Sequence, residues 1–406
     1  MRLSGRALVA AMCAGQVGNL LPHVVVPAVM PQHLMPLWQL SGSEAGLMAS
    51  SYALGYMLAV PILTTLTDRI DARLILFGGS AVSGLATIAF GVLADGLLSA
   101  ALLWALAGAG FAGAYMPGLK ALADRLGPGD ISRSVTLYTA CFSLGVGLSF
   151  LVSQLTAEHF GWRTAFYVAG LGPLAMIAAC LGLAPVKPKP AQAALLNFGP
   201  VLRNRPAMGY ILGYGAHCFE LYAIRTWIVA FWTFVVARNG GSAVLEPVTV
   251  SVITAVLAMP ASVLGNEMAM RFGRRAVIVT VMIVSGAVAF AIGSITSWAA
   301  PELMLGLVIL YAVTVPADSG ALTSGMTASA NPAYRGATMA MHSTVGFGLS
   351  AAGGWAIGVA LDAGGGPTSD IGWLTAFAVM ALSAFLGPLA LRWSARGGDS
   401  EVAKIN

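Results

Sequence analysis

The sequence predicts an all-α membrane protein in which twelve transmembrane helices form two pseudo-symmetric halves of six. Three observations predict this class. The 406-residue chain is only 9% charged, whereas soluble domains carry roughly 25% charged residues, so it has too few charges to cover a water-facing surface. Apolar stretches long enough to span a bilayer recur along the chain. Finally, the second half repeats short sequences of the first.

The expected spans are apolar stretches separated by short segments rich in Gly, Pro, Asn and charge. Each is expected to be a helix, because a segment in hydrocarbon must satisfy its own backbone hydrogen bonds. The 49 glycines are spread through these stretches, where small residues let helix backbones approach closely. In chain order the spans are expected near residues 7–30, 44–66, 74–94, 98–122, 134–158, 164–184, 207–237, 243–270, 276–297, 301–325, 336–361 and 371–392.

The distribution of positive charge predicts the orientation of these spans. With the N-terminus in the cytoplasm, 17 of the 21 Lys and Arg residues fall in cytoplasmic segments, and only Arg163 and Arg238 fall in segments on the opposite side. This asymmetry follows the positive-inside rule and puts both termini in the cytoplasm. It also accounts for the net charge of +5, so the lipid bilayer is the expected surroundings and no nucleic-acid partner is expected.

Three short sequences of the first half return in the second half, at spacings of 211, 201 and 202 residues. A nearly constant spacing indicates that the second half duplicates the first. The larger spacing fits an insertion in the Gly-rich loop at 363–367. The repeats are GWRTAF at 161–166 with GWLTAF at 372–377, GVGLS at 145–149 with GFGLS at 346–350, and VSG at 82–84 with VSG at 284–286.

A polar, Pro-rich stretch at 185–190 lies between the two halves and is typical of a semi-rigid linker. The sequence therefore predicts an N-terminal half at 1–184, a cytoplasmic linker at 185–206 and a C-terminal half at 207–406.

With twelve spans, cytoplasmic termini, two halves and a central linker, the chain resembles the major facilitator superfamily over essentially its whole length. That family carries Gly-x-x-x-Asp-Arg-x-Gly-Arg-Arg between spans two and three. The first loop departs from it at Thr64, Asp71 and Ala72, and the equivalent loop of the second half has Met270 where Asp is expected. The positions that match, for which the resemblance implies a cytoplasmic gating motif, are Asp68, Arg69, Arg73, Arg271, Gly273, Arg274 and Arg275.

The resemblance implies a monomeric secondary transporter of the bacterial inner membrane rather than an enzyme. In that family the halves rock about a site near the membrane midplane, which would take a small-molecule substrate with a coupling proton or a counter-solute. Drug–proton antiporters of the family often have Arg four residues before a Gly in span four and a Gly-Pro motif in span five. Here Trp104 precedes Gly108, and 143–147 contains no Pro. Both departures argue against a typical drug–proton antiporter.

Ionisable residues inside the spans are candidates for function, because each costs roughly 2.5–3.5 kcal/mol at the bilayer centre on insertion scales. Span seven carries His217, Glu220 and Arg225 within about 140° of one helix face, which should look into the bundle. Arg225 suits a carboxylate or similar oxyanion. Glu220 can carry a coupling proton, and His217 can titrate or contact substrate. The alternative is an internal Glu220–Arg225 pair that only holds helices together.

Two further charges lie inside spans beside prolines. Asp318 follows Pro316 in span ten, and Lys120 follows Pro117 in span four. Asp318 is a second candidate for proton coupling and Lys120 for substrate binding. The alternatives are an Asp318–Lys120 structural pair and, for Lys120, a side chain that snorkels to the cytoplasmic surface.

His23, in span one, lies 202 positions before Arg225, so the duplication places the two at equivalent positions. It is a candidate substrate ligand, with a hydrogen-bonded structural histidine as the alternative. His342, in span eleven, is a further candidate ligand, and Tyr222 is a candidate for substrate binding. The aromatic residues of span seven are candidates for the cavity wall, although aromatic residues in a bundle more often serve packing; they are Tyr214, Tyr222, Trp227 and Trp232.

The four cysteines all fall inside expected spans, where they serve as small apolar packing residues. They form neither a disulfide framework nor a zinc spacing. The Gly-x-G-x-x-Gly sequence at 108–113 lies inside a span with no preceding strand, so it is not a dinucleotide site. No metal or other cofactor is expected.

Three functions remain in competition. The leading interpretation is a proton-coupled or exchange transporter for a small organic solute, anionic rather than cationic. The second is an exporter of drug-like or amphipathic compounds. The third is a transporter-like sensor that binds a solute without moving it, against which the short linker argues because it leaves no room for a signalling domain. No nucleophile–base pair indicates an enzyme.

Overall fold

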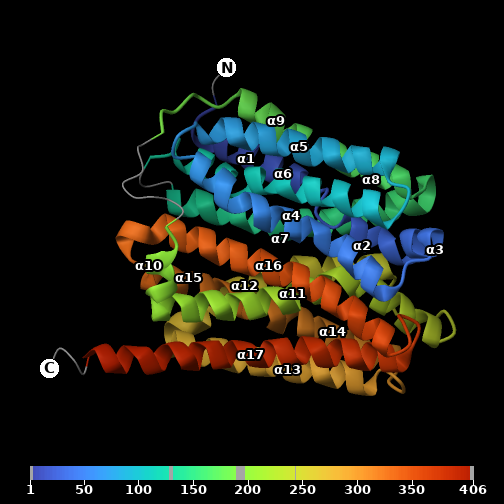
Figure 1. Cartoon of the computed structure of the whole chain (residues 1–406). Helices are drawn as coiled ribbons and strands as arrows, with labels where there is room; N and C mark the ends of the chain where they lie inside the picture. The colour runs from blue at the N-terminus through green and yellow to red at the C-terminus, as the bar shows by residue number, and fades with distance from the viewer. Residues whose placement is uncertain (1–2, 128–130, 189–196, 243, 403–406) are drawn as a thin grey trace. The chain divides into compact units, whose positions relative to one another are not determined.

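A computed structural model describes residues 3–127, 131–188, 197–242 and 244–402, and all their regular structure is helical (Figure 1). Eleven helices are long and apolar enough to cross a membrane. A further pair, Gly5–Leu20 with Val25–Trp38, passes the same test together with a bend of 47°, which gives twelve spans if the pair counts as one. The predicted all-α membrane class is therefore confirmed.

The first half begins with a broken span. Pro22 and Pro27 interrupt the helix after Leu20, since proline has no amide hydrogen and clashes with the preceding turn. Pro173 similarly divides span six into two helices. The elements are α1 (Gly5–Leu20), α2 (Val25–Val29), a π-helical turn η1 (Met30–Leu34), α3 (Met35–Trp38), α4 (Gly42–Leu66), α5 (Ala72–Leu93), α6 (Leu97–Ala123), α7 (Ile131–Phe160), α8 (Trp162–Leu171) and α9 (Leu174–Leu181).

The second half contains one broken span, at Pro316, where a 3-10 turn separates two helices. A short helix lies inside the predicted linker 185–206, and the next helix begins at Arg205. The elements are α10 (Gly199–Arg203), α11 (Arg205–Arg238), α12 (Pro247–Phe272), α13 (Arg274–Ile295), α14 (Pro301–Thr314), η2 (Val315–Asp318), α15 (Ser319–Ser329), η3 (Pro332–Tyr334), α16 (Arg335–Ala363) and α17 (Asp370–Val402).

The chain divides into two compact units. Unit 1 contains residues 1–40, 47–191 and 251–256, and unit 2 contains residues 41–46, 192–250 and 257–406. The main division, between residues 191 and 192, falls inside the predicted linker. Each unit thus contains most of one predicted half, and each has its own buried core.

Small residues set the helix spacing inside unit 1. A Cβ added to Gly79 of α5 would lie 2.6 Å from the carbonyl oxygen of Gly110 in α6, so these two helices touch backbone to backbone. Such contact is the packing that glycine permits in lipid, where tight van der Waals contact replaces the hydrophobic effect.

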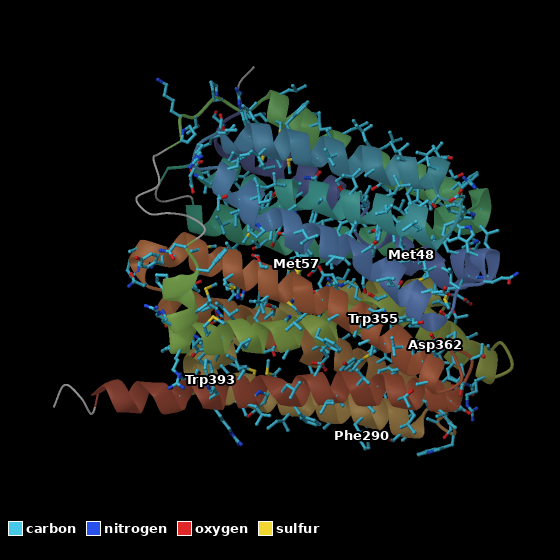
Figure 2. All side chains as sticks on the ribbon, in the orientation of Figure 1. Met48, Met57, Phe290, Trp355, Asp362 and Trp393 are labelled. Atoms are coloured by element: carbon cyan, nitrogen blue, oxygen red, sulfur yellow. The ribbon has the colours of Figure 1, made fainter. Side chains whose placement is uncertain are left out.

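Large apolar side chains are exposed on the helices of unit 2. Phe290 of α13 and Trp393 of α17 are examples (Figure 2), 55% and 42% exposed.

The repeated GW-x-TAF sequence builds equivalent aromatic clusters in the two units. In unit 1 the ring of Trp162 lies 5.9 Å from that of Phe166, edge to face. In unit 2 the rings of Trp373 and Phe377 are 6.3 Å apart. Phe166 stacks on Phe90 at 4.1 Å. In each unit the repeated sequence thus places a Trp ring against a Phe ring near the start of a helix, α8 in unit 1 and α17 in unit 2.

Candidate functional site

His217, near the middle of α11, is held by the break in span ten. Its Nδ1 lies 2.7 Å from Oδ1 of Asp318 and 3.1 Å from the carbonyl oxygen of Val315, so one nitrogen has two acceptors. Both side chains are almost completely buried, at 2% and 3% exposure. The 3-10 turn η2 presents both oxygens to α11, and Pro316 within it accounts for the break because it has no amide hydrogen.

Glu220 faces a different neighbour. Its Oε1 accepts a hydrogen bond of 2.7 Å from the Ser285 hydroxyl of α13, and the side chain is buried. Ser285 belongs to the VSG repeat at 284–286. His217, Glu220 and Asp318 therefore gather where α11, α13 and η2 meet inside unit 2.

Arg225 lies farther along α11 and is 9% exposed. Its guanidinium carbon sits 5.0 Å from the ring centroid of Tyr222, within the range of a cation–π contact. The ring of Tyr222 in turn contacts Phe347 of α16 at 5.8 Å.

A stack of rings connects α11 with α16. Tyr214 lies nearly parallel to His342 with centroids 3.8 Å apart, and 5.6 Å from His217 on its own helix. Nε2 of His342 lies 3.4 Å from the hydroxyl of Thr323 in α15. The stack brings the second buried histidine of unit 2 close to the first, a proximity that helix periodicity does not reveal.

His23 lies in unit 1 at the break between α1 and α2 and is 4% exposed. Three aromatic rings surround it, those of Tyr52, Phe111 and Phe142, at 5.2, 5.4 and 5.2 Å. His23 and Arg225, equivalent by the duplication, thus each lie against an aromatic ring within their own unit.

Lys120 is placed at the end of α6 and not deep in a span. Its Nζ pairs with Asp124 at 3.1 Å, and the two side chains are 33% and 30% exposed. This matches the snorkelling alternative for Lys120. Within unit 2 the partner of Asp318 is His217, and the carboxylate of Glu220 accepts a hydrogen bond from Ser285.

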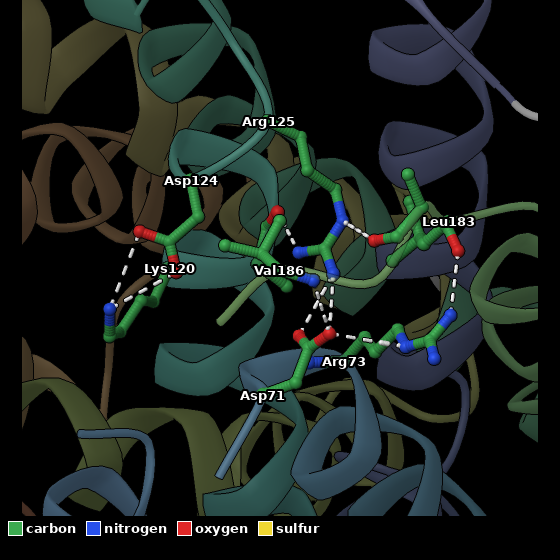
Figure 3. A network of polar contacts seen from close by, with 9 residues as sticks. Asp71, Arg73, Lys120, Asp124, Arg125, Leu183 and Val186 are labelled. Atoms are coloured by element: carbon green, nitrogen blue, oxygen red, sulfur yellow. Dashed lines mark hydrogen bonds and ion pairs between the residues drawn. The ribbon is translucent and has the colours of Figure 1, made fainter. Parts of the chain in front are cut away.

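The loop between α4 and α5 uses a residue that sequence reasoning treated as a departure from the motif. Asp71 caps the N-terminus of α5, where it accepts a hydrogen bond from the amide of Arg73. It also pairs with Arg125 at 2.8 Å and with Arg73 at 3.2 Å (Figure 3). Asp71 and Arg125 were missed as a functional pair because 54 residues separate them.

The two aspartates of this loop differ electrostatically. Burial raises the pKa of Asp71, but hydrogen bonds from Arg125 and from the amides of Val186 and Arg73 outweigh it and leave the pKa below its usual value. Burial raises the pKa of Asp68 above its usual value, although the charge of Lys120 opposes this effect. Asp71 is therefore the fixed negative charge of the loop.

In the second-half loop, Gly273 has a positive φ of 96° between α12 and α13, a conformation that favours glycine. The guanidinium of Arg271 lies 5.2 Å from the ring of Phe272. Arg274 and Arg275 begin α13. The four residues that match the motif therefore span the turn between α12 and α13.

Another contact that sequence reasoning missed lies inside unit 2. The carboxylate of Asp362, at the end of α16, accepts hydrogen bonds of 2.7 Å from the amides of Gly42 and Ser43. These amides open α4 and have no partner within that helix. Asp362 therefore acts as an N-cap supplied from 320 residues away.

Within the described ranges, no group of three or more His, Cys, Asp and Glu side chains could hold a metal ion. All four cysteines are free.

Comparison with known proteins agrees with this architecture. The family model of the Major Facilitator Superfamily matches residues 9–266. A bacterial homologue of the human lysosomal transporter Spinster has a similar structure, with a TM-score of 0.70, 18% identity, and coverage of 96% of this chain and 94% of that one. The nucleoside transporter NupG is also similar, with a TM-score of 0.75, 14% identity, and coverage of 95% and 98%.

At these identities the two structures support the fold and carry no information on the solute. The family match covers more than half of the chain, and it agrees with the helix count. This chain therefore belongs to the major facilitator superfamily of membrane transporters.

Proposed function

We propose that this chain is a secondary active transporter that carries a small organic anion across the bacterial inner membrane by alternating access, coupled to protons, and that it is not an enzyme. The observation that carries the proposal is the buried His217–Asp318 pair beside Glu220 in unit 2. Ionisable groups at membrane depth are costly and typically mark substrate or proton paths. The positive-charge bias supports cytoplasmic termini, and we propose a monomer.

In this proposal Asp318 links proton occupancy to helix conformation. The Nδ1 of His217 lies between the Asp318 carboxylate and the Val315 carbonyl. A proton on Asp318 weakens its attraction to His217 and leaves the carbonyl as the competing acceptor. Because both oxygens belong to the turn η2, a proton gained or lost there changes what holds α14 and α15 to α11.

Glu220 is the second proposed proton carrier, and Arg225 is the proposed substrate anchor. Ser285 supports the Glu220 carboxyl in either protonation state, since a hydroxyl can donate or accept. Arg225 carries a charge that does not titrate and a planar fork that matches a carboxylate. The ring of Tyr222 lies within cation–π distance of that fork. In this proposal α11 carries both a carboxyl that gains and loses a proton, at Glu220, and a cation that stays charged, at Arg225.

The first experiment identifies the substrate by a thermal-shift screen of purified protein against small carboxylates, amines and sugars. A ligand that binds the native state raises its melting temperature, because it stabilises that state by mass action. An anionic hit should then accumulate in liposomes under an imposed pH gradient. Stabilisation by amines alone would contradict the anionic assignment.

Proton coupling is tested with Asp318→Asn and Glu220→Gln. Each variant should lose pH-driven accumulation yet retain exchange of labelled for unlabelled substrate, since exchange needs no net proton movement. Glu302→Gln, at an exposed position in the first turn of α14, is the matched control and should behave like wild type. If both buried variants accumulate substrate normally, these carboxyls do not carry the coupling proton.

A further inference from the structure

The chain leaves α9 through a segment that cannot satisfy its own backbone. Residues 184–188 form no regular structure. Pro185 has no amide hydrogen, and the residue before a proline is biased to an extended conformation. The carbonyls of Leu183 and Ala184 and the amide of Val186 therefore need partners from elsewhere, because buried backbone groups are almost always paired.

Side chains from two earlier segments supply those partners. Arg125, just after α6, donates from Nε to the Ala184 carbonyl at 2.8 Å. Arg73, in α5, donates from Nη1 to the Leu183 carbonyl at 2.8 Å. The carboxylate of Asp71 accepts from the amide of Val186 at 2.8 Å. Figure 3 shows the three side chains converging on the segment that follows α9.

The same side chains are also fixed to one another. Nη2 of Arg125 donates to both oxygens of Asp71, at 2.8 and 3.0 Å, and Nη1 donates to the Ala121 carbonyl of α6 at 2.8 Å. All three guanidinium nitrogens of Arg125 are thus engaged. Its side chain is 5% exposed and that of Asp71 is 10% exposed, so water competes little for a charge-assisted pair of this kind.

We propose that Asp71, Arg73 and Arg125 form a linker anchor, a set of positioning residues that makes residues 183–186 part of the N-terminal body, so that the tether to the second half begins at Lys187. Loss of the anchor should lengthen the tether and uncouple the cytoplasmic ends of α5, α6 and α9. The part played in transport rests on the proposed function, whereas the anchor itself does not.

A neighbouring ion pair provides the internal control. The side chains of Lys120 and Asp124 are more exposed and pair with each other. Asp124 adjoins Arg125 in sequence, but among the described residues its side chain makes no hydrogen bond or ion pair to residues 183–186. Asp124→Asn therefore removes a similar charge at the same membrane surface while leaving the anchor intact.

The anchor is tested first without substrate. Val186→Cys, in a chain whose four native cysteines are replaced, is labelled with an impermeant maleimide from the cytoplasmic face of inside-out vesicles. Asp71→Asn should raise the labelling rate by about tenfold, since local opening controls access to a held segment. Arg125→Lys should give an intermediate rate, because an ammonium keeps the charge but lacks the fork. Asp124→Asn should leave the rate unchanged.

The effect on the cycle is tested with the same variants in liposomes. Asp71→Asn should lower the maximal transport rate by several-fold while the half-saturating substrate concentration stays unchanged, and size-exclusion profiles in detergent should match wild type. Equal labelling of Asp71→Asn and wild type overturns the anchor. Increased labelling with an unchanged transport rate overturns its positioning role. If the wild-type protein moves no solute at all, the proposed function fails, and the labelling result alone decides the anchor.

Discussion

At the scale of single residues, Arg225 owes its proposed role to its burial and to the ring beneath it. Arg225→Ala should abolish binding of an anionic substrate, and Arg225→Lys should restore it only in part, because an ammonium cannot form the bidentate contact. Binding is measured by calorimetry on purified protein. Arg238→Ala is the control, since Arg238 is an exposed cation that pairs with Asp370 at 2.9 Å. Full affinity in Arg225→Ala would remove this residue from the site.

The lowered pKa of Asp71 predicts how the contact between the loop and the linker depends on pH. In the folded state Asp71 has a depressed pKa, so its contribution to stability is fully present above the unfolded value, about 3.9, and is lost as pH falls through the lowered pKa. The labelling rate at Val186→Cys, divided by that of a free thiol at the same pH because maleimide reacts with the thiolate, should therefore stay low from pH 8 to about pH 5, well above both values, and rise only under strongly acidic conditions. A rise in labelling near neutral pH would show that Asp71 does not hold the linker.

The sequence identified single residues of the site better than their partners. His217, Glu220, Asp318 and Arg225 stand out because they are ionisable residues in apolar stretches, and all four are buried. The contacts His217–Asp318 and Glu220–Ser285 could not be predicted in the same way, since neither helix periodicity nor hydropathy indicates which faces of two helices meet. The VSG repeat pointed to Ser285 as a retained position, but only the structure shows that its hydroxyl reaches Glu220.

At the scale of helices, proline has opposite effects in two spans of unit 2. Pro316 lies in the broken turn η2, whereas Pro388 lies inside the uninterrupted helix α17. Pro316→Ala should let the helix continue, which removes the presentation of Val315 and Asp318 to His217. We expect a several-fold lower transport rate without loss of thermal stability. Pro388→Ala is the control and should leave transport unchanged; equal effects of the two changes would show that the break itself has no role.

The cap that Asp362 places on α4 is a second prediction at this scale. Asp362→Ala should lower stability by about 1 kcal/mol, the usual cost of losing an N-cap, while Asp362→Asn should lose less because an amide oxygen still accepts. Thermal unfolding in detergent measures both. Asp370→Ala, which removes only an exposed pair with Arg238, is expected to cost less. An unchanged melting temperature in Asp362→Ala would mean that water replaces the carboxylate at no cost.

Apart from the first span, which the sequence ends near residue 30 and the structure at Trp38, helix positions followed from the sequence to within a few residues, because long apolar stretches with charged ends are unambiguous. The helix α10 inside the predicted linker was not foreseen, since it is short and begins with Gly-Pro. A signal for the start of α11 was nevertheless present in Asn204-Arg205-Pro206. The side chain of Asn204 accepts from the amide of Ala207 at 3.2 Å, as an N-cap should.

For the whole molecule, the charge bias predicts which loops face which side. Single cysteines at Trp38, Gly240 and Gly365 should react with an impermeant thiol reagent added to intact cells, and a cysteine at Pro188 should react only after the membrane is opened. The native cysteines are replaced in this experiment too. Strong labelling at Pro188 from outside would invert the proposed topology.

The duplication also shows how differently the two copies have developed. The positions equivalent to His217 and Glu220, 202 residues earlier, are Gly15 and Gly18. A Cβ on Gly15 would lie 2.9 Å from the backbone of Met176, and one on Gly18 would collide with the carbonyl of Gly172. Ser83, the counterpart of Ser285, is buried with a hydroxyl that has no hydrogen-bond partner among the described residues.

The duplicated backbone thus encloses two different interiors, close-packed around glycine in the first unit and holding buried His217 and Glu220 in the second. Grafting a carboxylate onto Gly18 would find a hydroxyl in the equivalent place but no room for the side chain. Asymmetry of this kind between the two copies of a repeat shows which copy has room for a charged side chain.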